Sequence, residues 1–219
     1  MINKTHLLMA AMLFSAVAST SPASAQDRGI ALRGRHQLGF DLGAYSTNES
    51  SAYEDGYFRS DSSSTSPSAF VRYQYWFSDQ AAVTVQTGVL DSEVDFEFED
   101  DDDHWRMRSA DFSLVPLLVG MQFKPFAFET SGQSFFAIDI AVGPYVVSGT
   151  EYGHRHHSRE KSETVFGGCA GISHYWFLTD HLLLSANARY HLTGDFDKKL
   201  YGIENGTGFN GTVGLAWIW

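Results

Sequence analysis

The fold is decided by residues 212–219, which read Thr-Val-Gly-Leu-Ala-Trp-Ile-Trp. Large apolar residues at 213, 215, 217 and 219 alternate with smaller or polar ones, and this period of two indicates a β-strand. In a soluble protein, a terminal strand with four such residues on one face is an aggregation hazard unless something covers it. Lipid is a suitable cover, so the stretch predicts a membrane-embedded strand.

The first 25 residues have the pattern of a cleavable secretory signal. Lys4 precedes an apolar run from Leu7 to about Val17, and Ser21-Pro22-Ala23-Ser24-Ala25 follows it. The run is about half of the roughly 20 residues that a spanning helix needs, which argues against an N-terminal anchor. The residue directly after the expected cleavage site is Gln26 and not Cys, which argues against a lipid-anchored lipoprotein. We therefore expect residues 1–25 to be removed and residues 26–219 to form one domain.

Composition excludes several classes of protein. The chain has 15 basic and 26 acidic residues, a net charge of −11, whereas nucleic-acid-binding domains are usually basic. Cys169 is the single cysteine, so an internal disulfide is impossible. No run of about 18 apolar residues exists that could form a spanning helix. If the chain crosses a membrane, it must do so as a closed β-barrel.

Eight segments of alternating polarity, the weak signature of transmembrane strands, follow one another along the chain. In the first, Leu38, Phe40 and Leu42 alternate with Gln37, Gly39 and Asp41. An even number of strands brings both termini to one side, as in bacterial barrels. The sequence thus predicts an all-β fold, an eight-stranded antiparallel transmembrane barrel. The approximate ranges are 34–46, 66–77, 83–89, 104–123, 133–149, 163–177, 182–192 and 208–219.

The connections between these segments alternate in length. Those at 78–80, 178–180 and 124–132 are short or moderate, while those at 47–65, 151–162 and 194–207 are longer and polar. Outer-membrane barrels have short periplasmic turns and long extracellular loops, so we expect both termini in the periplasm. Aromatic residues near the short turns are expected to form a girdle at the membrane interface: Tyr75, Phe77, Phe123, Trp176, Phe177, Trp217 and Trp219.

A secreted soluble barrel or sandwich is the main alternative fold, because it shows the same alternation with its apolar face inward. The polar faces of the predicted strands argue against it. They are built from Gly, Ala, Ser, Gln, Arg and Asp rather than from the Lys and Glu of a solvated surface.

Two strand–turn joints carry a family resemblance. Tyr75-Trp76-Phe77-Ser78-Asp79 and Tyr175-Trp176-Phe177-Leu178-Thr179-Asp180-His181 resemble those of small eight-stranded outer-membrane barrels of the OmpA, OmpX and OmpW type. The arrangement of Thr212, Gly214, Trp217 and Trp219 resembles the C-terminal insertion signal of such barrels. The resemblance implies a monomer in a Gram-negative outer membrane, in contact with its lipid, its lipopolysaccharide and its assembly machinery. Pro116 and Pro144 depart from the pattern, because each removes a hydrogen bond inside a predicted strand.

The polar residues of the predicted strands are candidates for the barrel interior. An eight-stranded barrel is only wide enough for its own side chains, which argues against a general porin. Buried charges need partners, so we expect Arg72 and Arg189 to pair with acids. The favoured interpretation is a structural polar plug, and the alternative is a gated path for protons or a small solute. The interior candidates are Asp41, Arg72, Gln74, Gln86, Asp111, Asp139, Asn187 and Arg189.

An acidic run, Glu99-Asp100-Asp101-Asp102-Asp103, lies between the third and fourth segments. A tight turn at Asp101 and Asp102 would form a ladder of opposite charges across two strands. We therefore expect a two-stranded hairpin beyond the membrane, with one charged face and one apolar-aromatic face. The run itself is interpreted as a solvated loop, with a surface site for divalent cations as the alternative. The predicted pairs are Asp95 with Arg108, Glu97 with Arg106, Glu99 with His104, Phe96 with Met107 and Phe98 with Trp105.

A second cluster, His154-Arg155-His156-His157-Ser158, lies in a predicted extracellular loop. His-rich tracts can bind transition metals, but Arg155 in their midst and the lack of a fixed scaffold argue against a site. His156-x-Ser158 also resembles the His-x-Ser pair of outer-membrane lipid A deacylases, where His activates a Ser nucleophile. No acid partner or surrounding motif accompanies it. The sequence therefore assigns no catalytic residue, metal ligand or cofactor.

Two classes of function remain open. The first is a non-enzymatic barrel that acts structurally or through extracellular loops that contact surfaces or partners. The second, implied by the OmpW resemblance, is a narrow channel for small hydrophobic solutes. A lipid A deacylase is a remote third.

Overall fold

The computed structural model describes residues 31–47, 51–53, 58–60, 65–99, 105–125, 129–131, 133–152, 158–196 and 205–219. For residues 51–53, 58–60, 93–99, 105–111, 129–131, 150–152 and 158–161 it describes the backbone alone. The expected signal at 1–25, His104 with most of the acidic run, and His154 to His157 lie outside the described residues.

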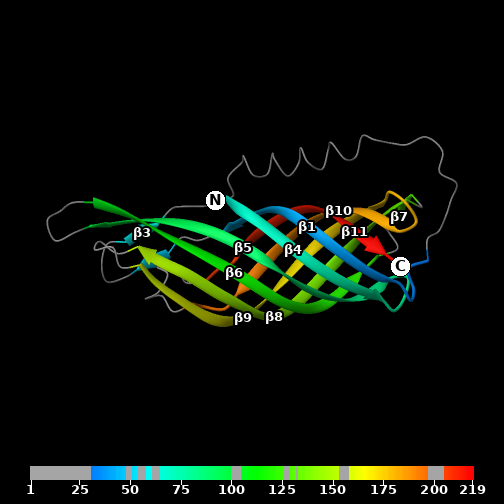
Figure 1. Ribbon diagram of the computed structural model, residues 1–219, viewed down its shortest axis with the longest axis horizontal. Coiled ribbons are helices and arrows are strands. Elements are labelled where there is room, and N and C mark those ends of the chain that lie inside the picture. The colour runs from blue at the N-terminus through cyan, green and yellow to red at the C-terminus, as the bar shows by residue number, and fades with distance from the viewer. Residues whose placement is uncertain are drawn as a thin grey trace.

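Eight long antiparallel strands form a closed barrel (Figure 1). Each pairs with the next long strand along the chain, and β11 pairs back with β1 to complete the circle. Three short strands, β2 (Ser51–Tyr53), β3 (Phe58–Ser60) and β7 (Glu129–Ser131), add to the sheet at its two ends. The long strands are β1 (His36–Thr47), β4 (Thr65–Trp76), β5 (Ala81–Glu99), β6 (Trp105–Phe123), β8 (Ser134–Tyr152), β9 (Ser158–Phe177), β10 (Leu182–Thr193) and β11 (Gly208–Ile218).

The predicted fold is confirmed, including a strand at each of the eight segments. The largest difference in length is in β5, which runs ten residues past the predicted 83–89 to Glu99. It does so because its ladder with β6 continues beyond the barrel to the pair Glu99 and Trp105. The two prolines that depart from the family pattern, Pro116 in β6 and Pro144 in β8, both lie within strands.

Two tight turns, at 78–80 and 178–181, define one end of the barrel, which we call the turn end. In each, a hydroxyl accepts hydrogen bonds from backbone N–H groups that the turn leaves free. Ser78 Oγ accepts from the N–H of Gln80 (3.2 Å) and of Ala81 (2.9 Å). Thr179 Oγ1 accepts likewise from His181 and Leu182. The carboxyl-terminal Trp219 also lies at this end, where its N–H and C=O exchange hydrogen bonds with His36. We call the opposite end, with the longer connections, the loop end.

The outer surface of the barrel is apolar. Large side chains at alternate positions of all eight strands are exposed, among them Phe40 (52%), Leu117 (54%), Ile140 (54%) and Leu215 (51%). A contiguous apolar surface of this kind marks a membrane or protein contact. Among the described residues, no helix has the length and apolar character needed to cross a membrane.

The proposed aromatic girdle needs one correction. Tyr75, Phe77, Phe123, Trp217 and Trp219 are exposed near the turn end, as expected. Phe177 instead packs toward the interior against Phe135, with ring centroids 6.0 Å apart. Phe177 lies on the same inward-facing side of β9 as Tyr175, two residues earlier. Because β9 is rich in glycine, its sequence lacks the apolar alternation that would show which side faces inward.

The predicted register of the hairpin between β5 and β6 is wrong by one residue. The structure pairs Glu97 with Met107, Phe98 with Arg106, Phe96 with Arg108, Asp95 with Ser109 and Glu99 with Trp105. The same register holds from Ala81 and Phe123 at the turn end, so the ladder within the barrel determines it. Exposed charge pairs contribute only about 0.2–1 kcal/mol each, too little to shift a ladder of that length. The predicted pairing of opposite charges across the two strands is therefore also wrong.

Candidate functional site

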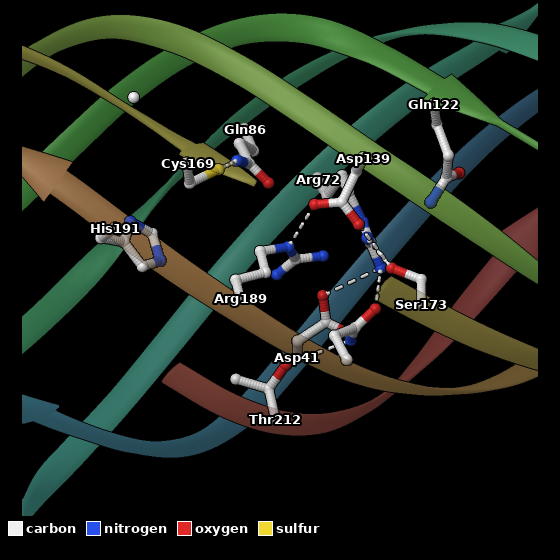
Figure 2. A network of polar contacts seen from close by, with 12 residues as sticks. Asp41, Arg72, Gln86, Gln122, Asp139, Cys169, Ser173, Arg189, His191 and Thr212 are labelled. Atoms are coloured by element: carbon white, nitrogen blue, oxygen red, sulfur yellow. Dashed lines mark hydrogen bonds and ion pairs between the residues drawn. The ribbon is translucent and has the colours of Figure 1, made fainter. Parts of the chain in front are cut away.

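A layer of buried polar side chains crosses the middle of the barrel interior, and each of the eight long strands contributes to it (Figure 2). These residues occupy the positions that alternate with the exposed apolar residues of the outer surface. The layer contains two ion pairs and the hydroxyl and amide groups that join them. Its principal members are Asp41, Arg72, Gln74, Gln86, Gln122, Asp139, Ser173, Ser185, Asn187, Arg189 and Thr212.

The first ion pair joins Arg72 of β4 to Asp41 of β1. Arg72 Nη2 lies 3.2 Å from Asp41 Oδ2, and both side chains are almost fully buried. Asp41 Oδ1 also accepts hydrogen bonds from Ser185 Oγ (2.8 Å) and Asn187 Nδ2 (3.1 Å) of β10. A buried carboxylate is tolerated only when it is paired and hydrogen-bonded. Asp41 meets both conditions through partners on two different strands.

The second ion pair joins Arg189 of β10 to Asp139 of β8. Arg189 Nε donates to Asp139 Oδ2 at 3.0 Å. Ser173 Oγ of β9 donates to Asp139 Oδ1 at 2.9 Å and accepts from Arg72 Nη1 at 3.4 Å. Ser173 thereby links the two pairs into one network with balanced formal charge.

Amide and thiol groups extend this layer. Gln74 Nε2 donates to Gln122 Oε1 at 2.6 Å, and Gln122 Nε2 donates to the Tyr175 hydroxyl at 3.0 Å. Gln86 Nε2 donates to Cys169 Sγ at 3.1 Å. Within the described residues, Arg189 Nη1 and Nη2 and Arg72 Nε make no hydrogen bond. Gln74 Oε1 likewise accepts no hydrogen bond there, so both donor and acceptor atoms of the layer stay unpaired among the described residues.

Seven of the eight predicted interior residues lie in or beside this layer: Asp41, Arg72, Gln74, Gln86, Asp139, Asn187 and Arg189. For Asp111 the structure describes the backbone alone, which pairs with Glu93 and Thr150. The interior position of the Asp111 side chain therefore stays a prediction.

Three further members of the network, Gln122, Ser173 and Ser185, are absent from the predicted interior set. Ser185 and Gln122 carry a usable signal. Gln122 lies between the exposed Met121 and Phe123, and Ser185 lies between the half-buried Leu184 and Ala186. Ser173 carries no such signal, because the neighbouring glycines of β9 hide which of its residues face inward. Thr212, predicted as part of the C-terminal signal, also belongs here, as its Oγ1 accepts from Asn187 Nδ2 at 3.1 Å.

An apolar cluster closes the interior at the turn end. It consists of Leu32, Trp76, Ala82, Phe135, Ala137, Tyr175, Leu183, Ala216 and Ile218. Leu32 reaches it from the segment before β1 and is 1% exposed. The carboxylate of Asp79 fixes this segment by accepting hydrogen bonds from the N–H of Leu32 (2.8 Å) and of Arg33 (3.0 Å). The Arg33 and Leu32 N–H groups hold the pKa of Asp79 below its ordinary 3.8, so this contact persists throughout the neutral pH range.

A second apolar cluster closes the interior at the loop end. It includes Tyr45, Phe70, Leu90, Phe112, Leu114, Leu118, Tyr145, Val147 and Phe196. Phe196 enters from the connection between β10 and β11, and its ring meets that of Phe112 edge-on at 6.4 Å. The Tyr45 hydroxyl donates to the carbonyl of Gly206 in the same connection. The interior is therefore a polar layer between two apolar closures.

The described residues offer no group of three or more His, Cys, Asp or Glu side chains that could hold a metal ion. Of the proposed His-x-Ser pair, His156 lies outside the described residues and Ser158 begins β9.

No protein-family model matches the chain, and no curated protein sequence matches it. Solved structures do match, but their sequence identities are so low that the likeness shows the fold alone. The crystal structure of the outer membrane protein OprG from Pseudomonas aeruginosa is 12% identical, covers 85% of this chain and 96% of its own, and has a TM-score of 0.55. Neisserial surface protein A is 12% identical, with coverage of 84% and 96% and a TM-score of 0.52. The attachment invasion locus protein Ail of Yersinia pestis is 11% identical, with coverage of 85% and 99% and a TM-score of 0.47. The closed barrel and its likeness to OprG and Neisserial surface protein A show that the protein has the fold of the small eight-stranded outer-membrane β-barrels.

Proposed function

We propose that this protein is a sealed, non-catalytic outer-membrane barrel that acts through the surface it presents at its loop end. The observation that carries the proposal is the closed interior, with an apolar cluster on each side of the polar layer. An ion entering either end would have to leave water and pass large buried side chains such as Trp76 or Tyr145. An eight-stranded wall leaves no room for a path around them.

The proposed orientation places the loop end outside the cell and both termini in the periplasm. Support comes from the tight turns and Trp219 at one end and the longer connections at the other, which is the arrangement of bacterial outer-membrane barrels. The exposed apolar band between the two ends would contact outer-membrane lipid and lipopolysaccharide.

Orientation can be tested with two matched cysteine variants, Asp195→Cys at the loop end and Asp180→Cys at the turn end. Both aspartates are exposed, and the native Cys169 is buried and serves as an internal negative control. With a membrane-impermeant maleimide on intact cells, we expect Asp195→Cys to react and Asp180→Cys to react only after the outer membrane is permeabilised. The reverse pattern would show that the loop end faces the periplasm.

A second candidate, a passage for small hydrophobic solutes, is favoured by one interruption in the barrel wall. The pairing of β6 with β8 skips from Pro116 and Tyr145 to Val119 and Val142, and the pairing of β5 with β6 also skips beside Pro116. Pro116 and Pro144 supply no N–H at these places. The interruption adjoins the apolar loop-end cluster, through Tyr145 and Leu118, so a hydrophobic solute could enter sideways from this point.

The two candidate functions predict different results when proteoliposomes are tested for uptake of a hydrophobic solute. If the wall is a passage, uptake exceeds that of protein-free vesicles, and Pro116→Val with Pro144→Val, which restores the N–H donors, abolishes the excess. If the barrel is sealed, both the wild type and the double variant stay at the protein-free level.

A further inference from the structure

Several buried polar atoms beside the ion-pair layer make no hydrogen bond with any described residue. Among them are Arg189 Nη1 and Nη2, His191 Nε2 and Asn210 Oδ1. The three side chains that carry these atoms are at most 1% exposed. Buried polar groups of folded proteins nearly always have a hydrogen-bond partner, which is either protein or ordered water. These four atoms therefore call for a partner other than the described side chains.

The three side chains are neighbours on the inner face of β10 and β11. Arg189 pairs directly with Asn210 across the two strands, and His191 is the next inward residue along β10. Directly opposed side chains lie about 5 Å apart, and alternate residues of one strand lie about 7 Å apart. Figure 2 shows Arg189 and His191 projecting from β10 into the barrel.

The ring of Phe70 on β4 adjoins two of these side chains. The guanidinium carbon of Arg189 lies 6.0 Å from the centroid of this ring, and the His191 ring stacks on it with centroids 5.8 Å apart. The unpaired atoms thus belong to one region of the interior, which we call the Arg189 site.

The hydrogen bonds of His191 indicate that its unpaired nitrogen is an acceptor. The Tyr145 hydroxyl donates its proton to the carbonyl of Gly168 at 3.1 Å, so it accepts from His191 Nδ1, which lies 3.0 Å away. Burial beside the Arg189 cation favours the neutral imidazole. A neutral imidazole that carries its proton on Nδ1 has a lone pair on Nε2.

The unpaired atom of Asn210 is also an acceptor. Asn210 Nδ2 donates to the carbonyl of Ala44 at 3.0 Å and to Ser68 Oγ at 2.7 Å. The carbonyl of Ala44 accepts only, so these bonds fix the amide nitrogen on that side and leave Oδ1 at the unpaired position. The Arg189 site therefore combines two donor nitrogens of Arg189 with two acceptors.

We propose that the Arg189 site binds ordered water, which joins Arg189 to His191 and Asn210. A water molecule both accepts and donates, so it can accept from Arg189 Nη1 or Nη2 and donate to His191 Nε2 or Asn210 Oδ1. An anion would satisfy Arg189 but would meet the two acceptor lone pairs, and Asp139 already balances the charge of Arg189. A metal cation would meet the positive guanidinium.

This water extends the polar network from the ion pairs toward the loop end. Through it, the pair of Asp139 and Arg189 connects to His191, and His191 connects to the Tyr145 hydroxyl in the loop-end cluster. Enclosed water is compatible with a sealed barrel, because both apolar clusters remain in place. The proposal does not depend on the orientation of the barrel in the membrane.

A crystal structure of the purified barrel, grown with bromide in place of chloride, tests the proposal directly. We expect electron density within hydrogen-bond distance of Arg189 Nη1 or Nη2 and of His191 Nε2 or Asn210 Oδ1, with no anomalous signal of bromide. An anomalous peak at this position would show an anion site and overturn the proposal. A direct hydrogen bond from Arg189 to His191 or Asn210, with no density between them, would also overturn it.

Magnetisation transfer from water to the guanidinium protons of isotope-labelled arginines tests the site in nanodiscs. Arg72 is the internal reference, because its Nη2 already donates to Asp41 at 3.2 Å and to Asn187 at 3.1 Å. We expect transfer to the Nη protons of Arg189 to be about fivefold stronger than to those of Arg72, because the bound water lies within hydrogen-bond distance of Arg189. Transfer to Arg189 that is no stronger than to Arg72 would contradict the proposal.

His191→Phe keeps a ring against Phe70 and removes the acceptor nitrogen. We expect transfer from water to Arg189 to fall about twofold in this variant, since one of the two acceptors that hold the water is lost. The matched control is Gln122→Met, which removes a buried polar side chain of the same layer whose hydrogen bonds go to Gln74 and Tyr175. We expect this control to leave the transfer to Arg189 unchanged. An unchanged value in His191→Phe, or an equal fall in the control, would overturn the assignment of His191 to the site. If His191→Phe does not fold, the two measurements on the wild type decide the proposal.

Discussion

Arg72→Met is expected to lower the free energy of unfolding of the barrel by about 3–5 kcal/mol, which is the usual cost of removing one partner from a buried ion pair. Asp41 would keep its hydrogen bonds from Ser185 and Asn187 but lose the cation 3.2 Å from its carboxylate. It would also lose the link that Arg72 makes through Ser173 to Asp139. Urea-induced unfolding in lipid vesicles, followed by the loss of heat-modifiable gel migration, measures the change.

The double variant Arg72→Met with Asp41→Asn is the matched control. It removes the uncompensated charge, while the amide oxygen that replaces the carboxylate can still accept a hydrogen bond from Ser185. Replacement of a whole buried pair is often close to neutral, so we expect the double variant to be more stable than Arg72→Met alone. If the double variant is at least as destabilised as the single one, the ion pair does not govern the stability of this layer.

Gly214→Ala is expected to destabilise the barrel by about 3 kcal/mol, at the upper end of the usual cost of overpacking, and to reduce the yield of folded protein. A Cβ at position 214 would stand well inside van der Waals contact of the Phe40 carbonyl oxygen and of the Asp41 carboxylate. The backbone of β1 cannot give way without breaking its ladder with β11. The folded fraction after refolding into vesicles, read from heat-modifiable migration, measures the effect.

Gly211→Ala, three residues earlier on β11, is the control for this prediction. A Cβ there would have its nearest neighbour at 3.8 Å, which is ordinary contact with the Phe209 ring. We expect its folded fraction to match the wild type. If Gly214→Ala folds as well as Gly211→Ala, the close approach of β11 to Asp41 does not constrain the sequence.

The strands could be predicted from the sequence because one side of each strand carries a strict apolar pattern. Leu38, Phe40 and Leu42 are exposed apolar residues at alternate positions of β1, and the same pattern recurs around the barrel. Polar lumen residues are recognisable where they alternate with these apolar residues, as Asp41 and Arg189 do.

The partners of the lumen residues could not be predicted from the sequence. Arg72 meets Asp41 on the neighbouring strand, but it also meets Ser173 and Asn187 across the interior. Such contacts depend on the stagger of the strands around the barrel, which no local pattern records. The hairpin register failed for a related reason, since local charge pairing is weaker than the long ladder that runs from Ala81 and Phe123.

The central claim is that two apolar closures seal the polar interior, and recording from planar lipid bilayers tests it most directly. Purified, refolded barrel would be added to one chamber, with a general porin in a parallel bilayer as the positive control. The sealed interior predicts a current no different from that of the protein-free bilayer at either sign of voltage. Reproducible discrete conductance steps that disappear when the protein is heat-denatured before addition would contradict it.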